Sequence, residues 1–247
     1  MSLFDHEARQ FKFDVLREVS KRSFEGKLNE DTCDEVANLL IPGKRADFRC
    51  CIYKEKEIIR QRTRMAMGKP PVPVEHENKR QIVRVIDAAC DGCSIHKIQV
   101  TDNCRKCMAK ACLSACKFDA IHMGNDHAFI DYDKCKECGA CKNACPFNAI
   151  VETQRPCMKS CPVDAISMGE SGLAEIDEEK CINCGACQAK CPFGAIEDMS
   201  WMVDVIEELK KGTEMYAIFA PAMQGQFDNA TLPQVMEGIR QLGFRDV

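Results

Sequence analysis

Residues 135–146 read Cys-Lys-Glu-Cys-Gly-Ala-Cys-Lys-Asn-Ala-Cys-Pro, and residues 181–192 repeat the same cysteine spacing as Cys-Ile-Asn-Cys-Gly-Ala-Cys-Gln-Ala-Lys-Cys-Pro. In a Cys-x2-Cys-x2-Cys-x3-Cys-Pro run, the first three thiolates hold one 4Fe–4S cluster and the fourth reaches the neighbouring cluster. Structural zinc also uses Cys-x2-Cys pairs, but it does not require the third and fourth cysteines or the trailing proline. The two runs therefore predict iron–sulfur sites.

A longer repeat contains these runs. Four segments share one ending, a cysteine followed by three residues and Ala-Ile, and they begin at Cys116, Cys145, Cys161 and Cys191. A repeated sequence unit indicates a repeated supersecondary unit. We therefore predict an α+β fold with two tandem bacterial ferredoxin-like modules, each a pseudo-symmetric pair of halves with two 4Fe–4S positions.

Cross-ligation assigns the cysteines of the first module to two clusters. Its first half has a Cys-x4-Cys gap, and Lys117 replaces the usual proline. Exchange of the fourth cysteine between the halves predicts two ligand sets. They are Cys104, Cys107, Cys112 and Cys145 for one cluster, and Cys135, Cys138, Cys141 and Cys116 for the other.

The second module lacks two cysteines. At the spacing of the other runs, Val151 and Gln154 occupy the first two positions of its first half, where only Cys157 and Cys161 remain. Cys161 is expected to complete the cluster held by the run from residue 181. That ligand set is Cys161, Cys181, Cys184 and Cys187.

Two thiolates, Cys157 and Cys191, are left without a complete site. Cys90-Asp91-Gly92-Cys93 is an otherwise unassigned pair just upstream. We therefore predict a fourth 4Fe–4S cluster at Cys90, Cys93, Cys157 and Cys191. The alternatives for Cys90 and Cys93 are free thiols or a zinc knuckle shared with Cys50 and Cys51. Cys33 is expected to be an ordinary helix-face residue, and Cys50 and Cys51 to be reduced thiols.

The flanks predict helices before the cysteine-rich region and an α/β unit after it. After residue 200 we expect a helix over 202–210, a strand over 215–220 and a helix over 233–242, a β-α-β unit without its last strand. The predicted domains are a helical N-terminal segment (1–68), a linker (69–80), the first module (81–153, with Cys90 and Cys93 serving the second), the second module (154–199) and an incomplete α/β catalytic-type domain (200–247).

Composition restricts the compartment and the partners. No signal peptide and no run of about 20 apolar residues is visible, and 19 cysteines are typical of a reducing cytoplasm. Because exposed clusters oxidise, an anaerobic host is expected. The formal charge is −4, and four clusters at about −2 each would lower it to about −12. Such a surface repels nucleic acid and is expected to attract basic redox partners at low salt.

Several sequence elements, most of them outside the two runs, resemble one known family. They are Arg49-Cys50-Cys51-x-Tyr53-Lys54-Glu55, Ala89-Cys90-x-x-Cys93, Val100-Thr101-Asp102-x-Cys104-Arg105, Arg155-Pro156-Cys157, Cys191-Pro192-Phe193-Gly194-Ala195-Ile196, Ala220-Pro221-Ala222 with Gln226-Phe227, and Leu242-Gly243-Phe244. Together they resemble the monomeric iron–iron (FeFe) hydrogenases with a cysteine-rich N-terminal half. The resemblance implies that four clusters relay electrons between an external ferredoxin and a catalytic six-iron centre.

The family's catalytic cysteine contexts, Thr-Ser-Cys-Cys-Pro, Met-Pro-Cys and Cys-Pro-Gly-Gly-Cys, do not occur in these 247 residues. We therefore expect an electron-relay module, from a truncated chain or a split gene, that is inactive as a hydrogenase alone. Two alternatives stay open: a free-standing polyferredoxin or electron-transfer subunit of another anaerobic oxidoreductase, and a non-redox scaffold with structural clusters. No membrane partner is expected.

Overall fold

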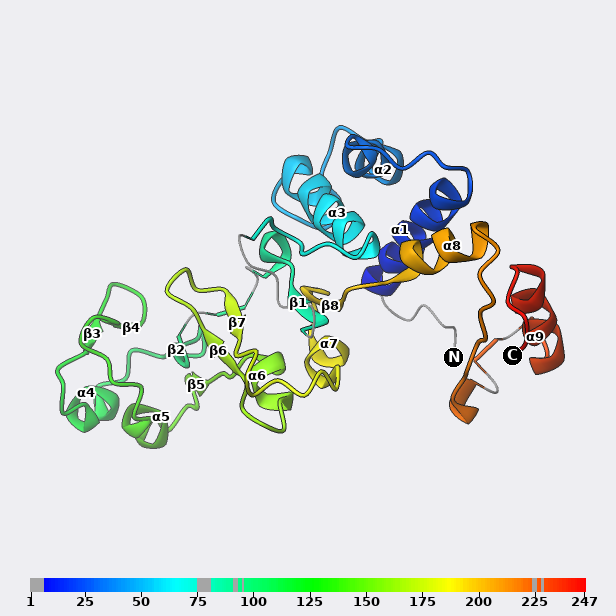
Figure 1. Ribbon diagram of the computed structural model, residues 1–247. Helices are drawn as coiled ribbons and strands as arrows, with labels where there is room; N and C mark the ends of the chain where they lie inside the picture. Colours follow the sequence, from blue (N-terminus) through cyan, green and yellow to red (C-terminus); the bar gives the residue numbers. More distant parts are fainter. Residues whose placement is uncertain (1–6, 75–80, 91–92, 95, 224–225, 228) are drawn as a thin grey trace. The chain divides into compact units, whose positions relative to one another are not determined.

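The computed structural model describes residues 7–74, 81–90, 93–94, 96–223, 226–227 and 229–247, and it confirms the predicted α+β class (Figure 1). The chain forms two compact units, one of residues 1–91 with 162–247 and one of residues 92–161. The last part of the expected linker, residues 75–80, lies outside the described residues. In the described part of the chain, no helix is long and apolar enough to cross a membrane.

Helices α1 (Glu7–Phe24), α2 (Thr32–Leu40), α3 (Ile52–Ala66) and α8 (Met202–Lys210) pack together in the first unit (Figure 1). Apolar side chains at helical spacing form their common core. Its fully buried members include Val15, Val19, Val36, Ala37 and Ile59. The helical N-terminal segment expected from the sequence is therefore present, and its stability comes from tertiary burial of one face of each helix.

Helix α3 also contributes to a second core of the first unit. Its Ile58 and Met65 pack with Ile86, Ala89 and Ala195, which flank the cysteine-rich segments. On the same helix Arg62 is buried, forms an ion pair with Glu197 and donates to the Gly194 carbonyl at 2.8 Å. The helix is thus tied to the end of the second cysteine run by both apolar and charged contacts.

The first unit holds two short antiparallel strand pairs. Strand β1 (Val83–Val85) pairs with β8 (Ile196–Asp198), and β6 (Ile166–Met168) pairs with β7 (Ala174–Ile176). The 3-10 helix η1 (Asp87–Ala89) follows β1, and α7 (Ala186–Lys190) precedes β8. The pairing places β1 in the sheet of the second module, although the sequence boundaries assign residues 81–89 to the first.

The second unit repeats this arrangement. Strand β2 (Ile98–Val100) pairs with β5 (Ile150–Glu152), and β3 (Ile121–Met123) pairs with β4 (Ala128–Ile130). Helices α4 (Ala111–Ala115) and α5 (Ala140–Ala144) pack against each other, and α6 (Pro156–Ser160) follows β5 (Figure 1, green). The core consists of strand residues and cysteines, with Ile98, Ile121, Ile130, Ile150, Cys112 and Cys141 among its members.

The C-terminal segment differs from the expectation. It contains η2 (Pro221–Met223) and α9 (Leu232–Gln241), but the strand predicted over residues 215–220 is reduced to one parallel bridge between Tyr216 and Asp246. Two backbone hydrogen bonds support this bridge, Arg245 N–H to the Met215 carbonyl (2.7 Å) and Ala217 N–H to the Asp246 carbonyl (3.0 Å). The strand prediction was too long, because pairing extends over only these few residues.

Candidate iron–sulfur sites

The cysteines lie in a local structure that recurs four times. In each copy a five-residue helix carries one buried cysteine, and the cysteine that ends the repeat caps the helix in extended backbone. The four buried and capping pairs are Cys112 and Cys116, Cys141 and Cys145, Cys157 and Cys161, and Cys187 and Cys191. The repeat read from the sequence is thus also a repeat of backbone conformation.

Left-handed residues turn the chain at matching places in these copies. The second residue between the first two cysteines has positive φ in three of them, at Lys106 (47°), Glu137 (51°) and Asn183 (54°). Positive φ is uncommon outside glycine, and recurrence at one position indicates a conformation required by the site. In the first two of these loops, the cysteines on either side of the turn line the same cavity.

One cavity of the second unit is lined by the four cysteines of the first predicted set. It has a volume of about 370 Å³, and its other lining residues are mostly apolar, including Phe147 and Ile150. The cysteines are Cys104, Cys107, Cys112 and Cys145. Four thiols around one small apolar cavity provide the donor set of a 4Fe–4S cluster.

The other predicted set of the first module lines a separate cavity of about 330 Å³. Its cysteines are Cys116, Cys135, Cys138 and Cys141, and Ile98 and Ile130 close its apolar wall. In both cavities the fourth cysteine comes from the opposite half of the module. The residues present therefore fit two clusters with exchanged fourth ligands, although coordination itself stays a prediction.

Backbone N–H groups point at several of these sulfur atoms. The alanine four residues after a capping cysteine donates to it in three copies: Ala120 to Cys116 (3.4 Å), Ala149 to Cys145 (3.4 Å) and Ala195 to Cys191 (3.3 Å). Glu137 N–H also donates to Cys135 Sγ at 3.4 Å. Hydrogen bonds of this kind stabilise thiolate over thiol and help to set the reduction potential of a bound cluster.

Burial affects the cysteines on the short helices. It raises the pKa of the Cys112 thiol, and the nearby Cys145 and Cys104 sulfurs raise it further, against the lowering effect of backbone hydrogen bonds. Burial likewise raises the pKa of Cys141. Deprotonation at neutral pH therefore requires a compensating positive charge, which iron supplies when the cluster binds.

Cys90 in the first unit and Cys104 in the second unit each accept an equivalent backbone hydrogen bond from within their own unit. Ala128 N–H, at the start of β4, donates to Cys104 Sγ at 3.4 Å, and Ala174 N–H, at the start of β7, donates to Cys90 Sγ at 3.3 Å. Each cysteine also follows a strand, β2 or β1, that pairs with the strand after a capping cysteine. Cys90 therefore occupies in the second module the position that Cys104 occupies in the first.

The remaining predicted ligands are divided between the units. The first unit contains Cys90, Cys181, Cys184, Cys187 and Cys191, whereas Cys93, Cys157 and Cys161 belong to the second. The two ligand sets of the second module therefore draw on both units and stay predictions.

Two polar residues of the first unit support the loop at Cys181, and sequence reasoning missed their roles. Gln81 is buried, and its Nε2 donates to Cys181 Sγ at 3.4 Å. Asn183 Oδ1 accepts the N–H groups of Ile82 (3.2 Å) and Val83 (3.3 Å). The place of Asn183 inside the Cys-x2-Cys pair is a local signal for its role, but no local pattern marks Gln81.

The three cysteines outside the predicted sets lie on the helical segment. Cys50 is exposed, and its Sγ lies 4.0 Å from that of Cys51, which caps the start of α3. Burial raises the pKa of the Cys33 thiol. In the described part of the chain, no three His, Cys, Asp or Glu side chains are grouped to hold a single metal ion.

Comparison with known proteins gives two family matches within the cysteine-rich region. Residues 128–151 match the 4Fe-4S binding domain, and residues 151–202 match the LdpA Fe-S cluster-binding domain. Both matches lie on the repeated segments described above.

Curated relatives include three ferredoxins. The chain is 42% identical over 55 residues to the ferredoxin of Alicyclobacillus acidocaldarius subsp. acidocaldarius, 41% over 51 residues to the 7Fe ferredoxin of Hydrogenibacillus schlegelii and 37% over 51 residues to ferredoxin-1 of Caulobacter vibrioides. These segments cover 70%, 65% and 45% of the relatives but only 22%, 21% and 21% of this chain. The chain belongs to the ferredoxin family, and it transfers electrons through 4Fe–4S clusters bound by its cysteine-rich motifs.

Proposed function

We propose that the chain is a four-cluster electron relay that serves a catalytic hydrogenase domain or subunit. The observation that carries the relay is the pair of cavities in residues 92–161, each lined by four cysteines from both halves of the module. Their short helices α4 and α5 pack together, so the module holds two one-electron sites close to each other. Two neighbouring carriers allow an electron to enter at one and leave from the other.

The second module is proposed to hold two more clusters. The matching hydrogen bonds Ala174 to Cys90 and Ala128 to Cys104 support Cys90 as a ligand in place of the missing first-half cysteines. The fourth site is then Cys90, Cys93, Cys157 and Cys191. Gln81 and Asn183, which brace the loop of Cys181, support the third site at Cys161, Cys181, Cys184 and Cys187.

A 4Fe–4S cluster, when bound, supplies a one-electron carrier of low potential. The chain's own groups position and tune it. The backbone N–H donors at Cys116, Cys145 and Cys191 direct partial positive charge at sulfur. Because reduction adds negative charge to the site, such donors favour the reduced form and raise the potential. The apolar walls of the cavities exclude water, which disfavours the added negative charge and lowers the reduction potential.

Two arginines support the hydrogenase context, because each belongs to an element that carries the resemblance and braces the segment of Cys90 and Cys93. Arg49 donates to the Ala89 carbonyl at 2.8 Å, and its guanidinium lies 4.9 Å from the centre of the Phe193 ring. In the second unit, Arg155 is buried and its Nε donates to the Ser94 carbonyl at 3.4 Å. Each arginine thus holds the backbone beside one of the two cysteines of the proposed fourth site.

The loop that carries Arg49 is itself fixed by a buried carboxylate. Glu55 Oε1 accepts the backbone N–H groups of Asp47 (2.7 Å), Phe48 (2.6 Å) and Arg49 (2.9 Å). Glu55 is fully buried, so this loop has one well-defined conformation. The Arg-Cys-Cys element is therefore built to place an arginine against the Cys90 segment.

A second candidate function is a free-standing polyferredoxin or an electron-transfer subunit of another oxidoreductase. The ferredoxin relatives favour it, since the matched segments cover ferredoxin modules only. The two candidates share clusters and fold, and fold does not determine the partner. They differ in whether a six-iron hydrogenase domain receives the electrons.

The test has two parts. The chain is reconstituted with iron and sulfide under anaerobic conditions, and dithionite titration should bleach its visible iron–sulfur band reversibly without hydrogen release, since four fully ligated clusters leave no open metal position. Failure to reduce reversibly would refute the relay. The gene and its neighbours are then read for the three hydrogenase cysteine contexts. If none of the three contexts is found, the free-standing polyferredoxin or electron-transfer subunit is the remaining candidate function.

A further inference from the structure

The two units differ in charge. Residues 92–161 contain ten Lys and Arg against seven Asp and Glu, whereas the rest of the chain contains 24 against 31, so the formal charges are +3 and −7. The two predicted clusters of the first module, whose ligands all lie in the second unit, would add about −4 to that unit. The second unit then stays close to neutral, whereas the first is acidic before any cluster binds. An acidic protein meets the least repulsion at the second unit.

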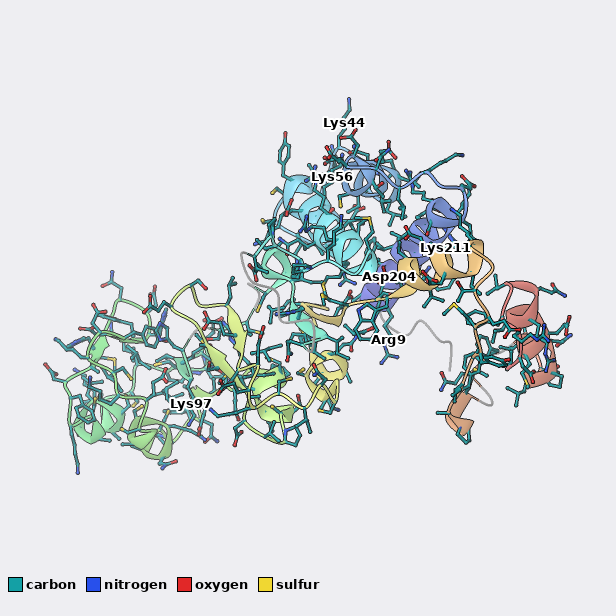
Figure 2. The ribbon with its side chains drawn as sticks, in the orientation of Figure 1. Arg9, Lys44, Lys56, Lys97, Asp204 and Lys211 are labelled. Atoms are coloured by element: carbon teal, nitrogen blue, oxygen red, sulfur yellow. The ribbon has the colours of Figure 1, made fainter. Side chains whose placement is uncertain are left out.

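Some cations of the second unit are already neutralised within the fold. Lys97 and Lys142 bind the Glu152 carboxylate at 2.7 and 2.8 Å, and these hydrogen bonds lower the pKa of Glu152 to about 2 (Figure 2 labels Lys97). Lys117 and Lys136, by contrast, are exposed and have no carboxylate partner among the described residues. Their charges are therefore available to another protein.

One of these lysines, Lys136, lines the cavity at which a predicted cluster ligand reaches the surface. Lys136, Phe118 and Cys138 line the same cavity, Cys138 is exposed, and Phe118 is 44% exposed. Lys117 directly precedes Phe118. We call these four residues the Cys138 rim. Glu137 also lines this cavity, but its carboxylate accepts the Lys97 backbone N–H at 2.8 Å.

The matching positions of the second module carry no cations. Pro162 and Val163 correspond to Lys117 and Phe118, and Ile182 corresponds to Lys136. The rim is therefore a property of the first module and is not required to hold a cluster. Because the second module keeps its fold without these side chains, the rim is a candidate surface for binding another protein.

From these observations we infer that the Cys138 rim is the docking surface for an acidic one-electron redox protein, which exchanges electrons with the cluster behind Cys138. This inference rests on the proposed relay and names its partner class. It differs from the expectation based on total charge, which favours a basic partner, because a partner responds to the local field at its point of contact.

The composition of the rim suits a transient electron-transfer contact. Such interfaces are small, with an apolar centre inside a charged surround. Phe118 provides the apolar centre, and Lys117 and Lys136 provide the charge. Because electron tunnelling falls steeply with distance, docking at an exposed predicted ligand such as Cys138 gives a short route to the cluster behind it.

The test uses the reconstituted 247-residue chain and an acidic flavodoxin as the probe. One electron passes between the flavin hydroquinone–semiquinone couple and the cluster-loaded chain, in whichever direction is downhill, and stopped-flow spectroscopy follows the flavin. The Lys117→Glu/Lys136→Glu variant should lower the second-order rate constant about tenfold or more at low ionic strength and weaken its salt dependence. A basic c-type cytochrome should not lose rate with this variant.

The matched control is Lys44→Glu/Arg45→Glu, which makes the same charge change on two exposed residues of the first unit (Figure 2 labels Lys44). It should change the flavodoxin rate less than about twofold. Iron content checks that each variant is loaded, and Lys117→Gln/Lys136→Gln replaces the first variant if it is not. Equal losses of flavodoxin rate in the variant and the control would overturn the assignment of the Cys138 rim as the docking surface. So would a loss of rate that occurs only in Arg105→Glu/Lys106→Glu, a variant of two residues at the other cavity.

These outcomes separate the inference from the proposed function. The docking surface alone would be refuted if dithionite bleaches the chain reversibly but the flavodoxin rate constant changes neither in the Lys117→Glu/Lys136→Glu variant nor with ionic strength. A chain that loads iron but cannot be reduced and reoxidised would refute the relay itself.

Discussion

The backbone N–H of Ala174 donates to Cys90 Sγ at 3.3 Å, although the two residues are 84 positions apart in the chain. The same contact joins Ala128 to Cys104 at 3.4 Å in the first module, with a separation of only 24. The Cys90 contact thus repeats the Cys104 contact, but it joins two segments of the first unit that lie on either side of residues 92–161 in the sequence.

This relationship leads to the first prediction. Cys90→Ser should lower the iron content from about 16 to about 12 atoms per chain, because one of four 4Fe–4S clusters loses a ligand. Cys33→Ser is the control, since Cys33 lies on α2 and belongs to no predicted set. Anaerobic iron and sulfide analysis measures both. An unchanged iron content in Cys90→Ser would remove Cys90 from the ligands.

The second prediction concerns the adjacent thiols. Cys51→Ser should leave iron content and cluster spectra unchanged, because its sulfur lies beside that of Cys50 at the start of α3 and Cys51 lines neither of the two cysteine-lined cavities described above. Electron paramagnetic resonance of the reduced protein is the measurement. If one cluster signal disappears in Cys51→Ser, the adjacent pair supplies a ligand and the fourth set is wrong.

The third prediction uses two glycines with positive φ. A Cβ at Gly194 (φ +57°) would lie 2.6 Å from Arg62 Nη2 and 2.7 Å from Ala8 Cβ, whereas one at Gly212 (φ +79°) meets nothing within 4 Å. Gly212→Ala should cost about 1 kcal/mol from backbone strain alone. Gly194→Ala should cost about 3 kcal/mol, because buried Arg62 cannot move away without losing its ion pair.

Anaerobic thermal unfolding, followed by circular dichroism, compares these two alanine variants at equal cluster loading. Equal midpoints for Gly194→Ala and Gly212→Ala would show that Arg62 does not approach Gly194 as described.

The fourth prediction tests the carboxylate that organises the Arg49 loop. Glu55→Ala leaves three backbone N–H groups without their acceptor and should destabilise the fold by at least about 2 kcal/mol. Glu57→Ala, two residues along α3 at a half-exposed position, removes a 3.4 Å pair with Arg60 and a 3.2 Å hydrogen bond from Gln61, and it should cost less than about 1 kcal/mol. Urea unfolding measures both, and similar losses would argue against a structural role for Glu55.

Local spacing was sufficient for much of the fold. The helix over residues 202–210 begins and ends where its apolar period indicates, and Ile58 and Ile59 of α3 are buried as their spacing suggests. The cysteine sets that line the two cavities follow from exchange of the fourth ligand, because that exchange is built into the repeat. The strand over residues 215–220 failed, since a strand exists only as far as its partner pairs with it.

The sequence by itself determined the α+β ferredoxin modules and the chemistry of their cysteines, because ligand spacing and helix periodicity act over a few residues. Only the tertiary structure decided that β1 pairs with β8 and brings Cys90 to Ala174, and that Gln81 supports Cys181. It also decided that Lys142 binds Glu152, whereas Lys136 has no carboxylate partner among the residues that the structure describes. Each of these depends on contacts between distant segments, which are selected by burial and packing of the whole unit and leave no mark in any local pattern.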